Sequence, residues 1–196
     1  MSAAPALFAG EGFAAFELSP EDAAEVQRVY EAAPSYFRIA LGAEAEADAA
    51  RKTFELRPPP DMAYSRKRVI GFRAPAGELA AVADVIEDLM AAHVWHVGLF
   101  LVPERLHGSG FAQRAYAALE AWMAAGGAQW LRLGVVGGND RAERFWRSRG
   151  YRLVREREGV AMGRKVNRLL VMAKPLGGAT LEEYFALVAR DRPRGG

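Results

Sequence analysis

The centre of the sequence contains the segment Val102-Pro103-Glu104-Arg105-Leu106-His107-Gly108-Ser109-Gly110-Phe111-Ala112. It follows a mostly apolar run, Val94 to Val102, which is typical of a strand covered on both faces. After the segment, apolar residues recur at helical spacing as far as Gly126. The segment is therefore predicted to join a buried strand to an amphipathic helix that begins near Gly108.

Such a strand-to-helix turn can bind an anion. Its free backbone N–H groups and the positive end of the helix dipole converge on one small volume. Gly108 and Gly110 have no Cβ, so a diphosphate could approach the main chain closely, and Arg105 could add charge at the rim. We expect a phosphate site at this turn.

Two common phosphate-binding patterns do not fit the turn. The P-loop pattern fails because Phe111 and Ala112, not Lys and Ser/Thr, follow Gly110. The dinucleotide fingerprint fails because Gln113 occupies its third glycine position and no acidic residue closes the next predicted strand near Val136. The pattern that remains is [RQ]xxGx[GA], which residues 105–110 satisfy.

A second pattern begins at Asn139 and runs to Tyr151, with the form NxxAxxFWxxxGY. Taken alone, Asn139 is most simply a helix N-cap and Phe145 a core residue. With both motifs at this interval, however, the sequence resembles the GCN5-related N-acetyltransferase (GNAT) superfamily from roughly Phe13 to Leu176. The match is strongest from Val94 to Tyr151.

The resemblance implies an α/β fold with a mixed, mostly antiparallel central sheet, helices on both faces, and two splayed strands that hold the cofactor. These strands would lie around Leu99 to Val102 and Leu133 to Val136. The implied cosubstrate is acetyl-CoA, with no metal. The residues that would bind it are Phe100, Leu101, Val102, Arg105, His107, Gly108, Ser109, Gly110, Phe111, Ala112, Asn139, Arg144 and Phe145.

The catalytic residues are less well marked than the cofactor turn. A backbone N–H of the splayed strand, with Phe100 the candidate, could stabilise the oxyanion of acetyl transfer. Many members of the superfamily carry a tyrosine acid where this chain has Trp146, and Tyr151 or water could substitute for it. Asp84, Glu87 and His96 are candidate bases that could act through water, although His96 could equally be a hydrogen-bonded core residue.

The acceptor pocket is expected near Tyr36 and Phe37, with Trp95 and Asp84 beside them, in a slot able to hold a small cation or amine. We therefore expect direct transfer of an acetyl group to a primary amine of a small molecule or peptide within a ternary complex. The alternative is a non-catalytic acyl-CoA-binding or sensing domain, which the lack of an obvious base favours.

The rest of the chain is predicted to supply the remaining layers of the domain. Residues 1–178 would form the GNAT domain and 179–196 a helical tail that packs on it or on a partner, so a homodimer is one expectation. The tail would contain a helix at 180–190. Pro34 is expected to break the first helix. Other strands are expected at 13–18, 67–72, 78–86, 130–136, 151–157 and 167–174, and other helices at 20–33, 43–54 and 140–149.

Composition fits an ordinary globular protein of 196 residues, with 51% hydrophobic residues and a net charge of +2. The absence of cysteine excludes disulfides, thiolate metal sites and a cysteine nucleophile, and three scattered histidines argue against structural zinc. Residues 141–168 hold ten bases and three acids, but no nucleic-acid-binding motif accompanies them. We expect a cytoplasmic protein that binds neither nucleic acid nor membrane.

Overall fold

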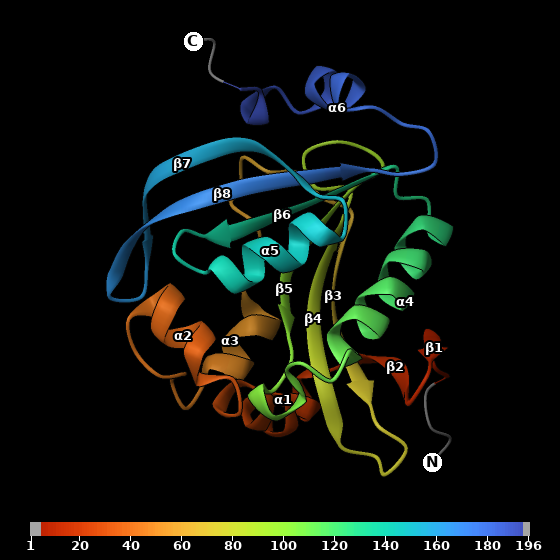
Figure 1. Ribbon diagram of the computed structural model, residues 1–196, viewed down its shortest axis with the longest axis vertical. Coiled ribbons are helices and arrows are strands. Elements are labelled where there is room, and N and C mark those ends of the chain that lie inside the picture. The colour runs from red at the N-terminus through yellow and green to blue at the C-terminus, as the bar shows by residue number, and fades with distance from the viewer. Residues whose placement is uncertain (1–4, 194–196) are drawn as a thin grey trace.

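The computed structural model describes residues 5–193 and has one eight-stranded sheet, in the order β1-β2-β3-β4-β5-β6-β8-β7. Neighbouring strands are antiparallel except for β5 and β6, which are parallel. The expected α/β fold is thus confirmed (Figure 1). The strands are β1 Phe8–Gly10, β2 Phe13–Leu18, β3 Arg66–Arg73, β4 Leu79–Glu87, β5 Val94–Leu101, β6 Trp130–Val136, β7 Arg152–Met162 and β8 Lys165–Pro175.

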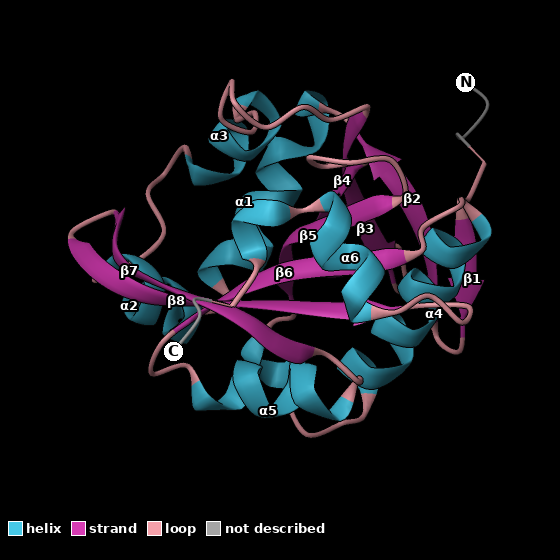
Figure 2. Cartoon of the chain, turned by 90° about the horizontal axis from the view of Figure 1, so that it is seen from above, coloured by secondary structure: helices cyan, strands magenta, loops and turns pink. Residues whose placement is uncertain are grey.

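Helices cover both faces of the sheet. In Figure 2, α1 and α3 lie above the sheet and α4 and α5 lie below it. Within the described residues no helix combines the length and apolar character needed to cross a bilayer. The helices are α1 Ala23–Glu31, α2 Pro34–Leu41, α3 Ala49–Glu55, α4 Phe111–Ala125, α5 Asp140–Ser148 and α6 Leu181–Leu187.

The first third of the chain differs from the sequence-based prediction. Pro34 does not simply break the first helix, because it occupies the first turn of α2, where its missing N–H costs nothing. Gly42, at φ 73°, ends α2, and the helix predicted over residues 43–54 is only the short α3. Strand β1 was also missed, since three residues carry too little periodicity to detect.

The two faces of the sheet bury separate hydrophobic cores. One face packs against α4 and α5 through residues such as Leu119 and Trp146. The other packs against α1, α2 and α3 through residues such as Val26 and Phe37. Alternation along each strand supplies both cores, since successive side chains point to opposite faces.

The pairing of β5 with β6 is short. It runs from Val94 opposite Trp130 to Val97 opposite Leu133 and then stops, so the strands diverge beyond that point. On its other side β5 stays paired with β4, but the register shifts at Asp84, leaving Gly98 as an extra residue. The splay predicted from the sequence is therefore present, and a bulge marks where it begins.

The C-terminal part of the described chain packs on the sheet near β6 and β8. Figure 1 shows α6 at the end of the molecule opposite α1. Tyr184 of α6 is buried with Val94 and Trp130, and the Trp130 indole donates a hydrogen bond of 2.8 Å to the carbonyl of Thr180. A capping box at Thr180 starts the helix. Residues 194–196 of the predicted tail lie outside the described residues.

Candidate active site

The turn between β5 and α4 has the geometry of an anion cradle. Gly108 and Gly110 adopt left-handed φ values of 78° and 79°, which residues with a Cβ rarely adopt. A Cβ at Gly108 would meet no atom within 4 Å, so the space beside it is open. Four backbone N–H groups here donate to no acceptor within residues 5–193, those of Gly108, Gly110, Ala112 and Gln113.

Side chains of the turn hold this conformation from within. The His107 ring nitrogen Nε2 lies 2.9 Å from the carbonyl oxygen of Val102 and ties the turn to the end of β5. The Ser109 hydroxyl donates to the Leu106 carbonyl at 2.7 Å and accepts from the Phe111 N–H at 3.2 Å. His107 and Ser109 are thus committed to the turn, which leaves its glycine amides free.

A cavity of about 340 Å³ lies beside this turn, between β5, α2 and α5. His107 and Ala112, on either side of the glycines, both line it. The lining residues that the sequence singled out are Tyr36, Phe100, Leu101, Val102, His107, Ala112, Asn139 and Phe145. The structure thus brings the two sequence motifs together at the opening between the splayed strands.

Aromatic rings form one wall of this cavity. Phe100 stacks on Phe145 with ring centres 6.2 Å apart, and Trp146 packs edge-on against both rings. Trp146 is buried in the core and also lines the cavity. Tyr151 cannot take the place of a tyrosine acid here, because its hydroxyl is buried against that of Tyr116 at 2.6 Å and burial raises its pKa.

Asn139 has its predicted place at the start of α5, whereas one arginine of this helix differs from the prediction. The Asn139 side chain caps α5 by accepting a 3.2 Å hydrogen bond from the Ala142 N–H, and it lines the cavity as well. The predicted Arg144 is exposed and does not line the cavity, whereas Arg141 does. Helical spacing explains the exchange, since the lining residues 141, 142, 145 and 146 fall on one face of α5 and residue 144 lies outside that face.

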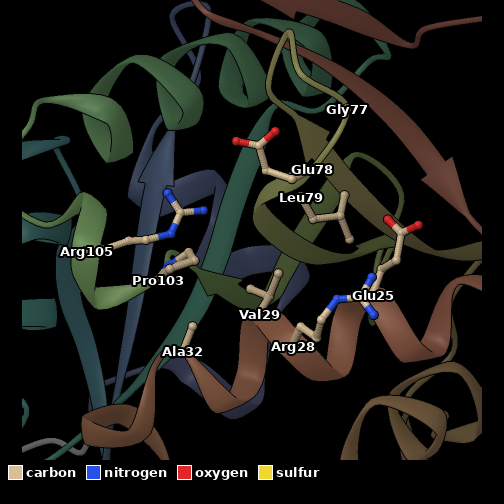
Figure 3. A pocket seen from close by; sticks show the side chains of 9 residues that line it. All are labelled: Glu25, Arg28, Val29, Ala32, Gly77, Glu78, Leu79, Pro103 and Arg105. Carbon is tan, nitrogen blue, oxygen red and sulfur yellow. The ribbon is translucent and has the colours of Figure 1, made fainter.

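Arg105 points away from the cavity beside the glycine turn. It lines a different cavity of about 330 Å³, together with residues of α1 and of the β3–β4 turn. In Figure 3 its side chain extends toward Glu78. Arg105 therefore does not line the cavity beside the glycine turn.

Asp84 and His96 line yet another cavity, of about 380 Å³, on the face of the sheet that α1 and α3 cover. The Asp84 carboxylate pairs with Lys67 at 3.1 Å, and burial raises the pKa of Asp84. Burial and the Arg132 guanidinium lower the pKa of His96 to about 3. His96 is therefore neutral and a poor base at neutral pH, which leaves Asp84 as the better candidate.

The structure corrects two of the predicted acceptor residues. Trp95 is buried against Trp122 under α4, on the opposite face from Asp84, and Phe37 is buried between Tyr30 and Tyr36. Neither lines the cavities described above. Tyr36 does line the cavity beside the glycine turn, and its pKa is raised by burial and by the charge of Asp84.

Comparison with known proteins agrees with this geometry. The sequence matches the Acetyltransferase (GNAT) family over residues 26–151, which include both motifs. The chain belongs to this family. No curated protein matches it. Within the described residues there is no group of three or more His, Asp or Glu side chains that could hold a metal ion.

Solved GNAT structures share the fold over most of the chain. An acetyltransferase from Thermus thermophilus is 26% identical, with a TM-score of 0.65 over 84% of this chain and 97% of that one. A spermidine N-acetyltransferase from Vibrio cholerae, in complex with CoA and spermine, is 12% identical, with a TM-score of 0.64 over 84% and 96%. A ribosomal-protein-alanine N-acetyltransferase from Brucella melitensis is 16% identical, with a TM-score of 0.60 over 83% and 99%. The last two similarities concern the fold alone.

Proposed function

We propose that this GNAT protein transfers the acetyl group of acetyl-CoA to a primary amine of a small molecule or peptide, directly within a ternary complex. One observation carries the proposal. The opening between β5 and β6 adjoins a glycine turn that presents four backbone N–H groups without acceptors in the described chain. A thioester cosubstrate with a diphosphate arm fits both features.

The residues of the turn and of the splayed strand would hold the cosubstrate. The diphosphate would accept hydrogen bonds from Gly108, Gly110 and Ala112, in the open space where a Cβ at Gly108 would project. The edge of β5 beyond Val97 has no pairing with β6, so its backbone groups are available to a pantetheine chain and to the oxyanion. Phe100 remains the proposed oxyanion donor.

The transfer needs an uncharged amine, and Asp84 is the proposed base. It would take one proton from the ammonium group, directly or through water. The amine nitrogen would then bond to the thioester carbonyl carbon, the carbon–sulfur bond would break, and the second proton lost by the nitrogen would pass, directly or through water, to the departing thiolate of CoA. A free thiol has a pKa of about 8.5, so the thiolate is a fair leaving group even though Trp146 replaces a tyrosine acid. Tyr36 lines the cavity beside the glycine turn, as Trp146 does, and would donate a hydrogen bond to the sulfur.

Binding of CoA tests the first half of the proposal. Saturating acetyl-CoA should raise the melting temperature and protect the backbone amides of residues 107–112 from hydrogen exchange. Gly108→Asp and Gly110→Asp should abolish both effects, because they place a carboxylate where the diphosphate binds. Gly12→Asp is a matched control, since Gly12 has a φ of 80°, open surroundings and a place in a different turn. Absence of any thermal shift and amide protection would overturn the proposal.

Turnover tests the second half. Release of free CoA is measured with amino acids, peptides, polyamines and aminoglycosides as acceptors. Turnover with any of these amines supports a transferase. Tight binding of acetyl-CoA without turnover of any amine would instead favour the non-catalytic acyl-CoA sensor.

A further inference from the structure

The charged side chains that line the cavity containing Asp84 are mostly cationic. Its walls come from Asp84 on β4, Arg132 on β6 and Arg157 on β7, and the segment after α3 adds Arg57 at the rim. Lys67 on β3 is its fourth cationic side chain, against a single lining carboxylate. Even with Asp84 ionised, this concave surface favours an anionic group.

Asp191 orients Arg132 and Arg157 but does not neutralise the charge of both. Its carboxylate accepts hydrogen bonds from Arg132 Nε at 2.6 Å and Nη2 at 3.2 Å, and from Arg157 Nη2 at 2.9 Å. One buried carboxylate is thus shared by two guanidinium groups, which leaves this cluster with an excess positive charge. The same contacts hold both guanidinium groups in a fixed orientation at the cavity.

Two polar atoms of this cavity lack partners. Only three buried side-chain nitrogen or oxygen atoms in the described chain make no hydrogen bond, and two of them are Asp84 Oδ1 and Arg157 Nε. One is an acceptor and the other a donor. Both atoms are shielded from solvent and would not touch a ligand directly, but Asp84 and Arg157 both line the cavity and each keeps an unmet hydrogen-bonding capacity. An ammonium group suits Asp84, and a carboxylate suits Arg157.

The ammonium end of such a ligand would lie close to the reaction centre. Asp84 is opposite the bulge in β5, and a Cβ built on Gly98 would be 3.5 Å from its Oδ2 atom. The bulge is where β5 separates from β6. The charge of Asp84 also raises the pKa of Tyr36, which lines the cavity beside the glycine turn, so the two cavities interact electrostatically.

We infer that the acceptor is a small amino acid or a related amine that carries a carboxylate, with its ammonium group at Asp84 and its carboxylate at Arg157 and Arg132. This inference rests on the proposed acetyl transfer and specifies its substrate class. A polyamine, like the spermine in the Vibrio cholerae complex, would meet like charge at this surface.

Matched acceptors provide the test. Rates of CoA release are compared for free amino acids, the corresponding amino acid amides, the corresponding decarboxylated amines, and spermidine. At least one amino acid should exceed its amide and its decarboxylated amine in kcat/KM by 10-fold or more, and spermidine should be the poorest acceptor. Equal rates for acid and amide, or a preference for spermidine, would overturn the substrate class but leave the transferase in place.

A variant pair assigns the preference to this cavity. Arg157→Gln should reduce the ratio of acid to amide turnover by about 10-fold, mainly through KM, while the thermal shift with acetyl-CoA is retained. Arg155→Gln is the control, because Arg155 lies on the same strand but contacts the carbonyl of Arg192 and lines a different cavity. An unchanged ratio in Arg157→Gln would contradict the assignment.

A binding measurement keeps the inference testable if no amine is turned over. Calorimetric titration of the CoA-bound protein with the same amino acids and amides would then be decisive. Binding selective for the free acids supports the cavity assignment even though the transferase proposal has failed. Absence of acid-selective binding refutes the cavity assignment itself.

Discussion

Replacing Asp191 by asparagine should strongly destabilise the protein. The carboxylate accepts four hydrogen bonds, two from Arg132, one from Arg157 and one of 2.7 Å from the Tyr184 hydroxyl. Asparagine keeps one acceptor oxygen, loses the negative charge, and turns an N–H₂ group toward donors. Removing one partner of a buried ion pair costs about 3–5 kcal/mol, so we expect Asp191→Asn to lower the free energy of unfolding by about 3 kcal/mol at pH 7.

The size of this loss should depend on pH. Burial alone would raise the pKa of Asp191, but its hydrogen bonds to Arg132, Tyr184 and Arg157 outweigh burial and lower the pKa from 3.8 to about 2. A depressed pKa gives stability that is present above pH 4 and is lost as pH falls toward 2. At about 1.4 kcal/mol per pKa unit, the difference in free energy of unfolding between the wild-type protein and Asp191→Asn should be about 1 kcal/mol smaller at pH 3 than at pH 7.

Urea unfolding followed by tryptophan fluorescence at pH 7, 5 and 3 measures both quantities. Asp61→Asn is the control, because Asp61 forms only an exposed ion pair with Arg190 at 3.4 Å and should change stability little. A loss below about 1 kcal/mol for Asp191→Asn, or a deficit that does not shrink with acid, would refute the reasoning that a buried carboxylate organises this cluster.

Three further outcomes follow from the site. Gly108→Ala and Gly12→Ala should each lower the free energy of unfolding in urea by about 1–2 kcal/mol, because both positions have left-handed φ. Only Gly108→Ala should weaken CoA binding measured by calorimetry. Equal CoA affinities of the two variants would contradict the anion cradle at Gly108. Tyr116→Phe should lower the free energy of unfolding by about 1 kcal/mol, since it leaves the buried Tyr151 hydroxyl unpaired, and a stabilised variant would disprove that role. If Asp84 is the base, the initial rate should rise with pH through a pKa above 3.8, because burial raises the pKa of Asp84. Asp84→Asn should abolish this rise. An unchanged dependence of the rate on pH in the variant would exclude Asp84.

Local signals predicted the glycine turn after β5 and the start of α5 at Asn139. The glycine turn and the Asn139 cap depend on contacts within a few residues, so motif and spacing were enough to place them. That Arg141 and not Arg144 lines the cavity could also have been predicted, because the position of Phe145 fixes which face of α5 is turned to the cavity. Trp95 could not be placed in the same way, since a strand with apolar residues on both faces gives no sign of which face an aromatic side chain occupies.

The charged cavity was beyond the reach of sequence patterns. Its walls are assembled from residues as far apart as Arg57, Asp84 and Arg157, and only the order of the strands brings them together. Asp191 illustrates the difficulty, because nothing around it in the sequence marks it as the partner of Arg132. Such clusters depend on tertiary contacts that local periodicity does not encode.

The short parallel pairing at the centre of the sheet has a mechanical consequence. Strands β1 to β5 follow one another as antiparallel neighbours, and β6, β8 and β7 form a second antiparallel group. The ladder between the groups spans only the four residue pairs from Val94 to Val97. The sheet thus consists of two antiparallel groups of strands joined by a short parallel ladder. A pantetheine chain bound between β5 and β6 would add contacts between the two groups. Cosubstrate binding should make these two groups of strands unfold more cooperatively.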